Sequence, residues 1–217
     1  MRTFGWSDVW FIVEAARWTL ALSVIAFIGG GLLGLLIALA RTSDLHGLRR
    51  AALAFIKLFQ GTPLLLQLFL IFFGAPVIGL EIDPWIAAGV ALTLNSAAFL
   101  GEIWRGCIEA VPHGQTEAAQ ALSLGWVDRM RDVILPQAAR IAVAPTVGYL
   151  VQIVKGTSLA AIIGFTEITR AGQIVNNATF QPLVVFSVVA ALYFVLCWPL
   201  SRLAARLERR QANAWAR

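Results

Sequence analysis

The most constraining feature of this chain is a series of long stretches without a charged residue. They cover residues 18–40, 58–80, 84–101 and 171–201, and in the last of these residues 182–201 have the length of one helix. A helix needs about 20 mainly apolar residues to cross a bilayer. Apolar residues make up 59% of the 217 and charged residues only 13%, whereas soluble domains carry about 25% charged residues. We therefore predict an all-α membrane protein.

A further crossing is expected between residues 141 and 166, where Lys155-Gly156 separates two apolar segments. Each segment is too short to span a bilayer alone, so we expect a helix that breaks or ends near Lys155 and continues as an irregular apolar stretch. The prediction is one transmembrane domain over residues 1–217. Its five spans are expected at about 18–40, 51–80, 84–105, 138–155 and 182–207.

Lys and Arg are distributed unevenly between the two sides that these five spans define. Thirteen fall on one side and four on the other, namely Arg2, Arg17, Lys155 and Arg170. Because basic loops tend to remain in the cytoplasm, we predict an outside amino terminus and a cytoplasmic carboxyl terminus. We attribute the net charge of +5 to these loops and expect no nucleic-acid partner.

The longest predicted cytoplasmic connection contains a short alanine-rich helix at about 117–124. Thr116 is suited to cap it, because its hydroxyl can accept a hydrogen bond from a first-turn amide, and Glu117 then has a favourable place in the helix dipole. Gly125 is placed to end the helix in a left-handed conformation. A second short helix is expected at about 127–135. Taken alone, this pattern also fits a solvated linker.

The spacing in this segment resembles the signature loop of the inner-membrane permease subunits of ATP-binding-cassette importers. In that loop, Glu-Ala-Ala is followed by the Pro of Leu-Pro nineteen residues after the Glu, which matches Glu117-Ala118-Ala119 and Leu135-Pro136. Two positions depart from the pattern. Ser123 occupies the usual glycine position, with Gly125 two residues later, and Val133 replaces the usual Ile, which leaves a shifted turn open.

The resemblance covers nearly the whole chain and is strongest to the polar amino-acid permeases. The ordered matches are Gly61-Thr62-Pro63-Leu64-Leu65, Asn95-Ser96-Ala97-Ala98 leading to Glu102-Ile103-Trp104-Arg105-Gly106, Gly114-Gln115, Lys155-Gly156-Thr157-Ser158-Leu159-Ala160 and Thr179-Phe180-Gln181-Pro182. This implies a multi-pass protein of the bacterial inner membrane that carries a polar or charged amino acid into the cytoplasm.

The resemblance also implies partners. It predicts a second permease chain (another copy or a related chain), an extracellular or periplasmic amino-acid-binding protein, and ATPase subunits that bind ATP and Mg²⁺. A coupling segment at 114–136 is expected to dock its short helix into a groove of the ATPase. Its coupling residues are Glu117 as the charged contact, Ala118 and Ala119 as the close-packed face, and Leu122 and Gly125. The basic tail 202–217 is predicted to contact anionic lipid headgroups, or alternatively an ATPase.

The chain itself lacks the pattern of an ATP site. A P-loop needs a Lys followed by Ser or Thr after a glycine-rich run, but Lys57 is followed by Leu58 and Lys155 by Gly156. His46 and His113 are isolated in predicted loops, without neighbours at metal-ligand spacing. We therefore predict no enzyme activity, no metal and no cofactor in this chain.

Polar side chains inside the spans are candidates for the substrate pathway, because they are costly in lipid and usually face a cavity or another helix. A broken helix adds backbone groups that can bind a charged solute. The candidates are Thr62, Gln67, Asn95, Ser96, Gln152, Thr157 and Ser158. The alternative for Gln67 and Asn95 is a hydrogen bond between neighbouring helices. A permease whose partner chain alone binds the substrate also remains open.

Two other patterns have structural interpretations. Gly29, Gly30, Gly31 and Gly34 are predicted to permit close helix packing. Glu102 and Arg105, three residues apart near the cytoplasm, are expected to form a local ion pair. A self-contained channel or a secondary transporter is the alternative function. It is disfavoured because all twelve acidic residues fall at or near predicted interfaces, whereas proton-coupled carriers usually place a carboxylate mid-membrane.

Overall fold

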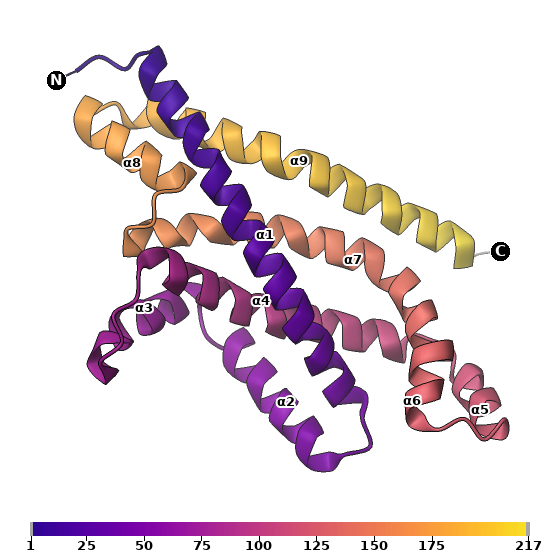
Figure 1. The fold of residues 1–217 in the computed structure, drawn as a ribbon. Helices are drawn as coiled ribbons and strands as arrows, with labels where there is room; N and C mark the ends of the chain where they lie inside the picture. Colours follow the sequence, from indigo (N-terminus) through magenta and orange to yellow (C-terminus); the bar gives the residue numbers. More distant parts are fainter. Residues whose placement is uncertain (1, 216–217) are drawn as a thin grey trace.

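The computed structural model describes residues 2–215, in which every regular element is helical (Figure 1). The elements are α1 (Trp6–Thr42), α2 (His46–Gln60), α3 (Leu64–Gly74), η1 (Pro76–Ile78), α4 (Pro84–Glu109), α5 (His113–Ala121), α6 (Trp126–Asp128), η2 (Arg129–Ile134), α7 (Leu135–Gly156), η3 (Thr157–Ile163), α8 (Ile168–Thr179) and α9 (Pro182–Trp215). The predicted all-α class is confirmed.

Four helical stretches are long and apolar enough to cross a membrane. They are Trp6–Thr42, Pro84–Glu109, Trp126–Ile163 and Pro182–Gln211. A fifth crossing is formed if α2 and the segment Leu64–Ile78 count as one span, although the two are bent by 98°. The structure therefore agrees with about five membrane-spanning elements.

Two elements differ from the expected spans in ways that local chemistry explains. α1 begins at Trp6 and not near residue 18. The Asp8 carboxylate accepts a hydrogen bond from the Gly5 N–H at 2.9 Å, which fixes the start of the helix, and Asp8 also pairs with Arg2. The span expected over 51–80 is present as two helices and not as one. It breaks at Pro63, since proline has no N–H to donate and disfavours helical backbone at the residue before it.

The carboxyl-terminal half agrees with expectation at one point and differs from it at two. α7 ends at Gly156, where the sequence predicts a break, and the chain continues as the tighter 3₁₀ helix η3. The expected short helix at 127–135 runs directly into α7 through α6 and the π-helical turn η2. α8 (Ile168–Thr179) was not predicted, because it lies within and just before the charge-free run over 171–201.

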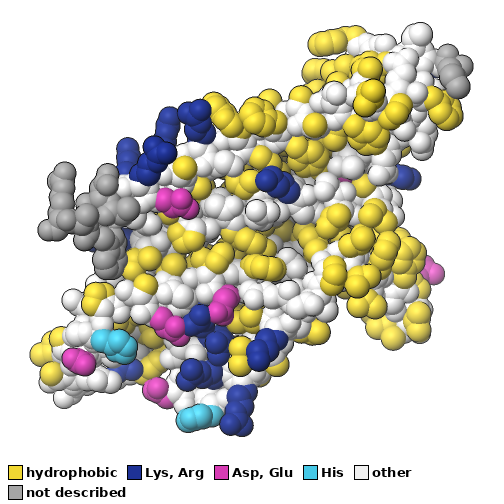
Figure 2. Space-filling model, turned by 180° about the vertical axis from the view of Figure 1, so that it is seen from behind, with side chains coloured by type: hydrophobic (Ala, Val, Ile, Leu, Met, Phe, Trp, Pro, Cys, Tyr) yellow, Lys and Arg dark blue, Asp and Glu magenta, His cyan; other side chains and the backbone are white. Residues whose placement is uncertain are grey.

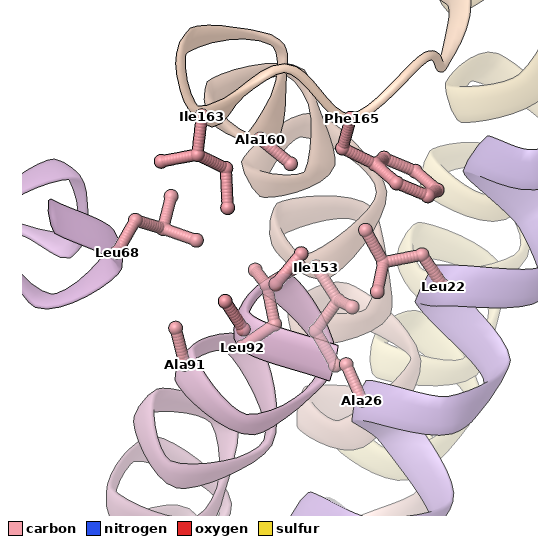
Figure 3. Packing of buried hydrophobic residues seen from close by; sticks show 11 residues of the cluster. Leu22, Ala26, Leu68, Ala91, Leu92, Ile153, Ala160, Ile163 and Phe165 are labelled. Carbon is pink, nitrogen blue, oxygen red and sulfur yellow. The ribbon is translucent and has the colours of Figure 1, made fainter. Parts of the chain in front are cut away.

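The core lies where α1, α3, α4, α7 and η3 meet (Figure 3). Apolar side chains from all five converge there, among them Leu22, Leu68, Leu92, Ile153 and Ile163. Outside this core, large apolar side chains are exposed on the long helices, as expected for surfaces that face lipid. In Figure 2 most Lys and Arg side chains lie in two groups, one near the end of α9 and a larger one at the lower edge of the molecule.

Glycines allow α1 to approach α4 closely. A Cβ added at Gly30 would lie 2.5 Å from the Cβ of Ser96, and one at Gly34 would lie 3.1 Å from the backbone nitrogen of Gly101. Gly29 is similarly close to Thr93, whereas Gly31 meets only the ring of Trp104 at 3.5 Å. The predicted packing role is thus confirmed for Gly29, Gly30 and Gly34 but not for Gly31.

Candidate functional site

Polar side chains bridge the break between α2 and α3. The Gln67 amide nitrogen donates to the carbonyl of Phe59 at 2.8 Å, to the carbonyl of Thr62 at 3.0 Å and to the Thr62 hydroxyl at 2.9 Å. The Thr62 hydroxyl donates to the carbonyl of Leu58 at 2.8 Å. These carbonyls lie where the helix ladder is interrupted, and unsatisfied backbone groups are costly in an apolar layer. Gln67 and Thr62 therefore stabilise the bend.

Asn95 joins this network from α4. Its side-chain nitrogen donates to the Gln67 carbonyl oxygen at 3.1 Å, and both side chains are buried. Thr62, Gln67 and Asn95 thus form one connected polar cluster between the break and α4. Of the two roles that the sequence left open for Gln67 and Asn95, the hydrogen bond between neighbouring helices is the one the structure contains.

Ser96 does not join this cluster. Successive residues on a helix point about 100° apart, so Ser96 is turned away from its neighbour Asn95. Its Cβ faces Gly30 on α1, and the side chain is buried in the contact between α1 and α4. The structure places Ser96 in helix packing.

The second break lies beside the first. Around Gly156, a Cβ would meet Leu64 of α3 at 3.3 Å and Leu92 of α4 at 3.4 Å. The Thr157 hydroxyl donates to the carbonyl of Val154 at 2.7 Å and is fully buried. Both interruptions of the helices therefore pack against α4.

The other two candidates at this break have different surroundings. The Ser158 hydroxyl donates to the carbonyl of Lys155 at 2.7 Å, one turn back along the chain. Gln152 is exposed on the surface of α7. Neither residue is hydrogen-bonded to the cluster of Thr62, Gln67 and Asn95.

The predicted coupling helix exists as α5, but its ends differ from expectation. It begins at His113 after Pro112, so Thr116 lies inside the helix and is not its N-cap. At the other end Leu124 N–H donates to the carbonyl of Ala119 at 3.1 Å, and Ser123 N–H donates to that of Gln120 at 2.8 Å. This is the Schellman pattern, whose left-handed position is usually glycine.

The left-handed residue here is Ser123, with φ of 61°. Gly125 has an extended backbone, with φ of −63° and ψ of 167°, and precedes α6. The predicted role of Gly125 as the left-handed end of the helix is therefore wrong. The turn is not shifted: Ser123 adopts the conformation that glycine would favour, because the two hydrogen bonds close the turn at that position.

α5 presents part of its surface outward. Glu117 and Ala118 are exposed, and Leu122 is 76% exposed at the end of the helix. Ala119 is buried within the chain, on the side where α5 packs against η2. The expectation that Ala118 and Ala119 together form a face for a partner is thus wrong for Ala119, which holds α5 against its own subunit.

The predicted ion pair on α4 is present and has an additional member. Arg105 Nε donates to Glu102 at 2.9 Å, which confirms the pair, and the same guanidinium also pairs with Glu109. The spacing of four residues between Arg105 and Glu109 gives the signal for this third member. All three residues lie within two turns of α4, so the ion pairs are local to that helix.

Glu167 has a structural role that the sequence did not predict. Its side chain is fully buried and accepts hydrogen bonds from the N–H groups of Thr169 and Arg170, both at 2.9 Å, and from the Tyr193 hydroxyl at 2.6 Å. Burial raises the pKa of this carboxyl, against the lowering effect of the hydrogen bonds. Glu167 caps α8 and fixes it to α9.

One sequence signal could have identified Glu167. An acidic residue directly before an amphipathic segment is favoured by the dipole of the helix that follows, and α8 begins at the next residue. The carboxyl lies between the candidate spans and not within one. α1 also contributes to this junction, because the Thr19 hydroxyl accepts from the Ile168 N–H at 3.3 Å.

Comparison with known proteins assigns the family. Residues 30–213 match the sequence profile of the family described as "Binding-protein-dependent transport system inner membrane component". The chain belongs to this family. The long apolar helices agree with the description of the family as an inner membrane component.

Relatives within the same class match along nearly their whole length. The "Glutamine transport system permease protein GlnP" of Escherichia coli strain K12 is 38% identical, over 95% of this chain and 97% of that protein. The "Probable amino-acid ABC transporter permease protein YckA" of Bacillus subtilis is 36% identical, over 94% and 90%. A solved structure, "Crystal structure of an amino acid ABC transporter with histidines", has a TM-score of 0.87 at 34% identity, covering 97% of this chain and 100% of that one.

Proposed function

We propose that the chain is the membrane-spanning permease subunit of an ATP-driven importer for a polar amino acid. The names of the relatives support this class of substrate, since they include a glutamine transport permease and an amino-acid ABC transporter permease. Glutamine is accordingly the first substrate to test. ATP and Mg²⁺ would be bound by a separate ATPase subunit.

The observation that carries the proposal is α5. It is a short helix outside the long apolar helices, with Glu117 and Ala118 exposed on its surface and Leu122 exposed where it ends. An exposed carboxylate with an exposed alanine beside it and a leucine at the helix end offers a partner groove both a charged and an apolar contact. α5 also rests on η2, which continues into α7, so movement of the docked helix would reach the membrane.

The arrangement of the subunits follows from the distribution of charge. In the proposed topology five crossings form one transmembrane domain, with the amino terminus outside and the carboxyl terminus in the cytoplasm of a bacterium. The coupling segment 114–136 then faces the ATPase, and the opposite side faces an amino-acid-binding protein. A second permease chain, identical or related, would complete the pathway.

The pathway is proposed to pass the two breaks that pack against α4. Broken helices offer backbone groups to a polar solute at membrane depth. The chain bends by 98° after Gln60, and the α-helix tightens to a 3₁₀ helix after Gly156. Thr62, Gln67 and Asn95 line one break, and Thr157 lines the other. Gln152 and Ser158 are weaker candidates, because neither bonds to this cluster.

The proposal is tested by purifying the tagged chain from its native membranes in mild detergent, identifying its partners and measuring amino-acid uptake. We expect an ATPase to co-purify. Glu117→Lys is expected to leave membrane insertion intact but to lower ATPase association and uptake on the order of tenfold, because it reverses a charge at the docking surface. Asp44→Lys reverses an exposed charge in the connection between α1 and α2, outside α5, and serves as the control.

Two results would reject this function. Normal ATPase association and uptake in Glu117→Lys would remove the role of α5 in coupling. Uptake into vesicles that contain the chain without any ATPase would support the alternative, a self-contained channel or secondary transporter.

A further inference from the structure

The carboxyl-terminal end of α9 carries arginines on one helical face. After the apolar part of the helix ends near Ser201, arginines follow at positions 202, 206, 209 and 210. With about 100° between successive residues, Trp198, Arg202, Arg206 and Arg209 lie within about 80° of one another. The row therefore begins at an aromatic residue in the apolar part and continues as a line of positive charge.

This face points away from the rest of the chain. The opposite side of α9 is packed inward through Cys197 and Ala204, which are both buried. The Gln211 amide fixes the same side to the start of α7 by donating to the carbonyl of Arg140 at 2.6 Å. Figure 1 shows α9 running beside α7, and Figure 2 shows basic side chains projecting at this end of the molecule.

The row includes a small cavity. Trp198, Pro199, Arg202, Leu203 and Arg206 line a space of about 210 Å³. The Arg202 guanidinium lies over the Trp198 ring, 4.6 Å from its centroid, which fixes its orientation. Two guanidinium groups one turn apart, above an apolar floor, match a phosphate whose attached carbon chains pass into the membrane.

The charge of this row is not neutralised by the described part of the protein. Among residues 2–211, whose side chains the structure describes, Arg202, Arg206, Arg209 and Arg210 form no salt bridge with a carboxylate. Glu208 is the one acidic residue in this segment, and it is exposed. An anion from outside the chain is therefore favoured at this surface.

We propose that Trp198, Arg202 and Arg206 form a binding site for the phosphate headgroup of an anionic phospholipid. The position of the site favours lipid over an acidic protein, because the same face continues into the exposed apolar side chains of Phe194 and Val195. A lipid bound there would place its headgroup on the arginines and its acyl chains along that apolar face. The site does not depend on the proposed transport function.

The test measures the binding of phosphatidylglycerol to the detergent-purified chain, together with any subunits that co-purify, by native mass spectrometry. Phosphatidylethanolamine serves as the competing lipid. The double variant Arg202→Gln/Arg206→Gln is expected to bind phosphatidylglycerol roughly 30-fold more weakly, since each basic residue near an anionic surface contributes about 1 kcal/mol. Arg202→Lys/Arg206→Lys keeps both charges but loses the guanidinium planes that stack on Trp198 and match a phosphate, so its affinity should lie between that of wild type and that of the Gln variant.

The matched control is Arg49→Gln/Arg50→Gln on α2, which removes two exposed arginines without an adjoining tryptophan cavity. An equal loss of phosphatidylglycerol in this control would overturn the proposal, since binding would then follow total charge. Unchanged lipid binding in Arg202→Gln/Arg206→Gln would also overturn it.

Two further results would assign the arginines to another ligand. If that variant lost a co-purifying subunit while its lipid binding was unchanged, the arginines would belong to a protein interface. Displacement of the lipid by an excess of inorganic phosphate would indicate a site for free phosphate.

Discussion

Ser123 shows how a single residue departs from the preferred chemistry of its position. It holds a left-handed backbone, with φ of 61°, at the turn that ends α5. Left-handed backbone costs a residue with a Cβ about 1 kcal/mol or more. The two hydrogen bonds of the turn maintain that conformation, so the chain retains the geometry of the signature loop without its usual glycine.

Replacing Ser123 by glycine is expected to stabilise the end of α5 by about 1 kcal/mol, because glycine has no Cβ to strain in this conformation. Hydrogen exchange of the last α5 amides should then slow about fivefold. Ser123→Ala, which keeps the Cβ, is the control and should give no such protection. Equal exchange in the two variants would show that the turn stores no strain.

At the residue scale the sequence predicted contacts between near neighbours and missed those set by tertiary packing. Glu102 and Arg105 are three residues apart on one helix, and the pair was predicted from that spacing alone. Glu167 and Tyr193 are 26 residues apart, and only the packing of α8 on α9 brings them together. The burial of Glu167 therefore could not be derived from the local pattern.

At the scale of elements, composition locates apolar segments but does not establish their continuity. Residues 58–80 carry no charge, which suggests one helix, yet the chain bends by 98° near Pro63. Hydropathy averages over the bend, and only the backbone chemistry of Gly61-Thr62-Pro63 indicates it. The end of α7 at Gly156 was predictable because a charge and a glycine interrupt the apolar run there.

The contact between α1 and α4 gives a prediction at this scale. Gly30→Ala would place a Cβ 2.5 Å from that of Ser96, so it is expected to destabilise the protein by about 1–3 kcal/mol through overpacking. Gly31→Ala meets its nearest neighbour at 3.5 Å and should be neutral or stabilising by up to about 1 kcal/mol.

Thermal exposure of the buried thiols of Cys107 and Cys197 to a maleimide dye provides the measurement for both glycine variants. Gly30→Ala should expose them at a lower temperature than wild type, and Gly31→Ala should not. If the two variants unfold at the same temperature, close approach at Gly30 does not limit the packing of α1 on α4.

For the whole molecule, the number of crossings depends on how the bent pair sits in the membrane. Four helical stretches can cross alone, and the pair of α2 and Leu64–Ile78 adds a fifth if it passes through. The distribution of Lys and Arg favours five, since four would separate the basic loop after α1 from the basic end of α9. The sequence thus predicted the architecture of the chain better than the course of its second span.

Cysteine labelling from outside the cell tests this topology. In a background with Cys107 and Cys197 replaced by serine, Glu81→Cys should react with a membrane-impermeant maleimide on intact cells. His46→Cys should react only after permeabilisation, because a complete crossing separates the two positions. The background without cysteines is the control. Labelling of both positions from one side would show that α2 and α3 form a re-entrant hairpin.

The direct continuation of α6 and η2 into α7 has a mechanical consequence. α7 is about 33 Å long at 1.5 Å per residue, and it ends at the 3₁₀ segment η3. One end of α7 is joined through η2 to the surface that contacts α5, and its other end lies at Gly156. A tilt of α7 at the first end would therefore move the second. A tilt of about 5° at α5 would displace the far end by about 3 Å, an amplitude comparable to the width of a water molecule.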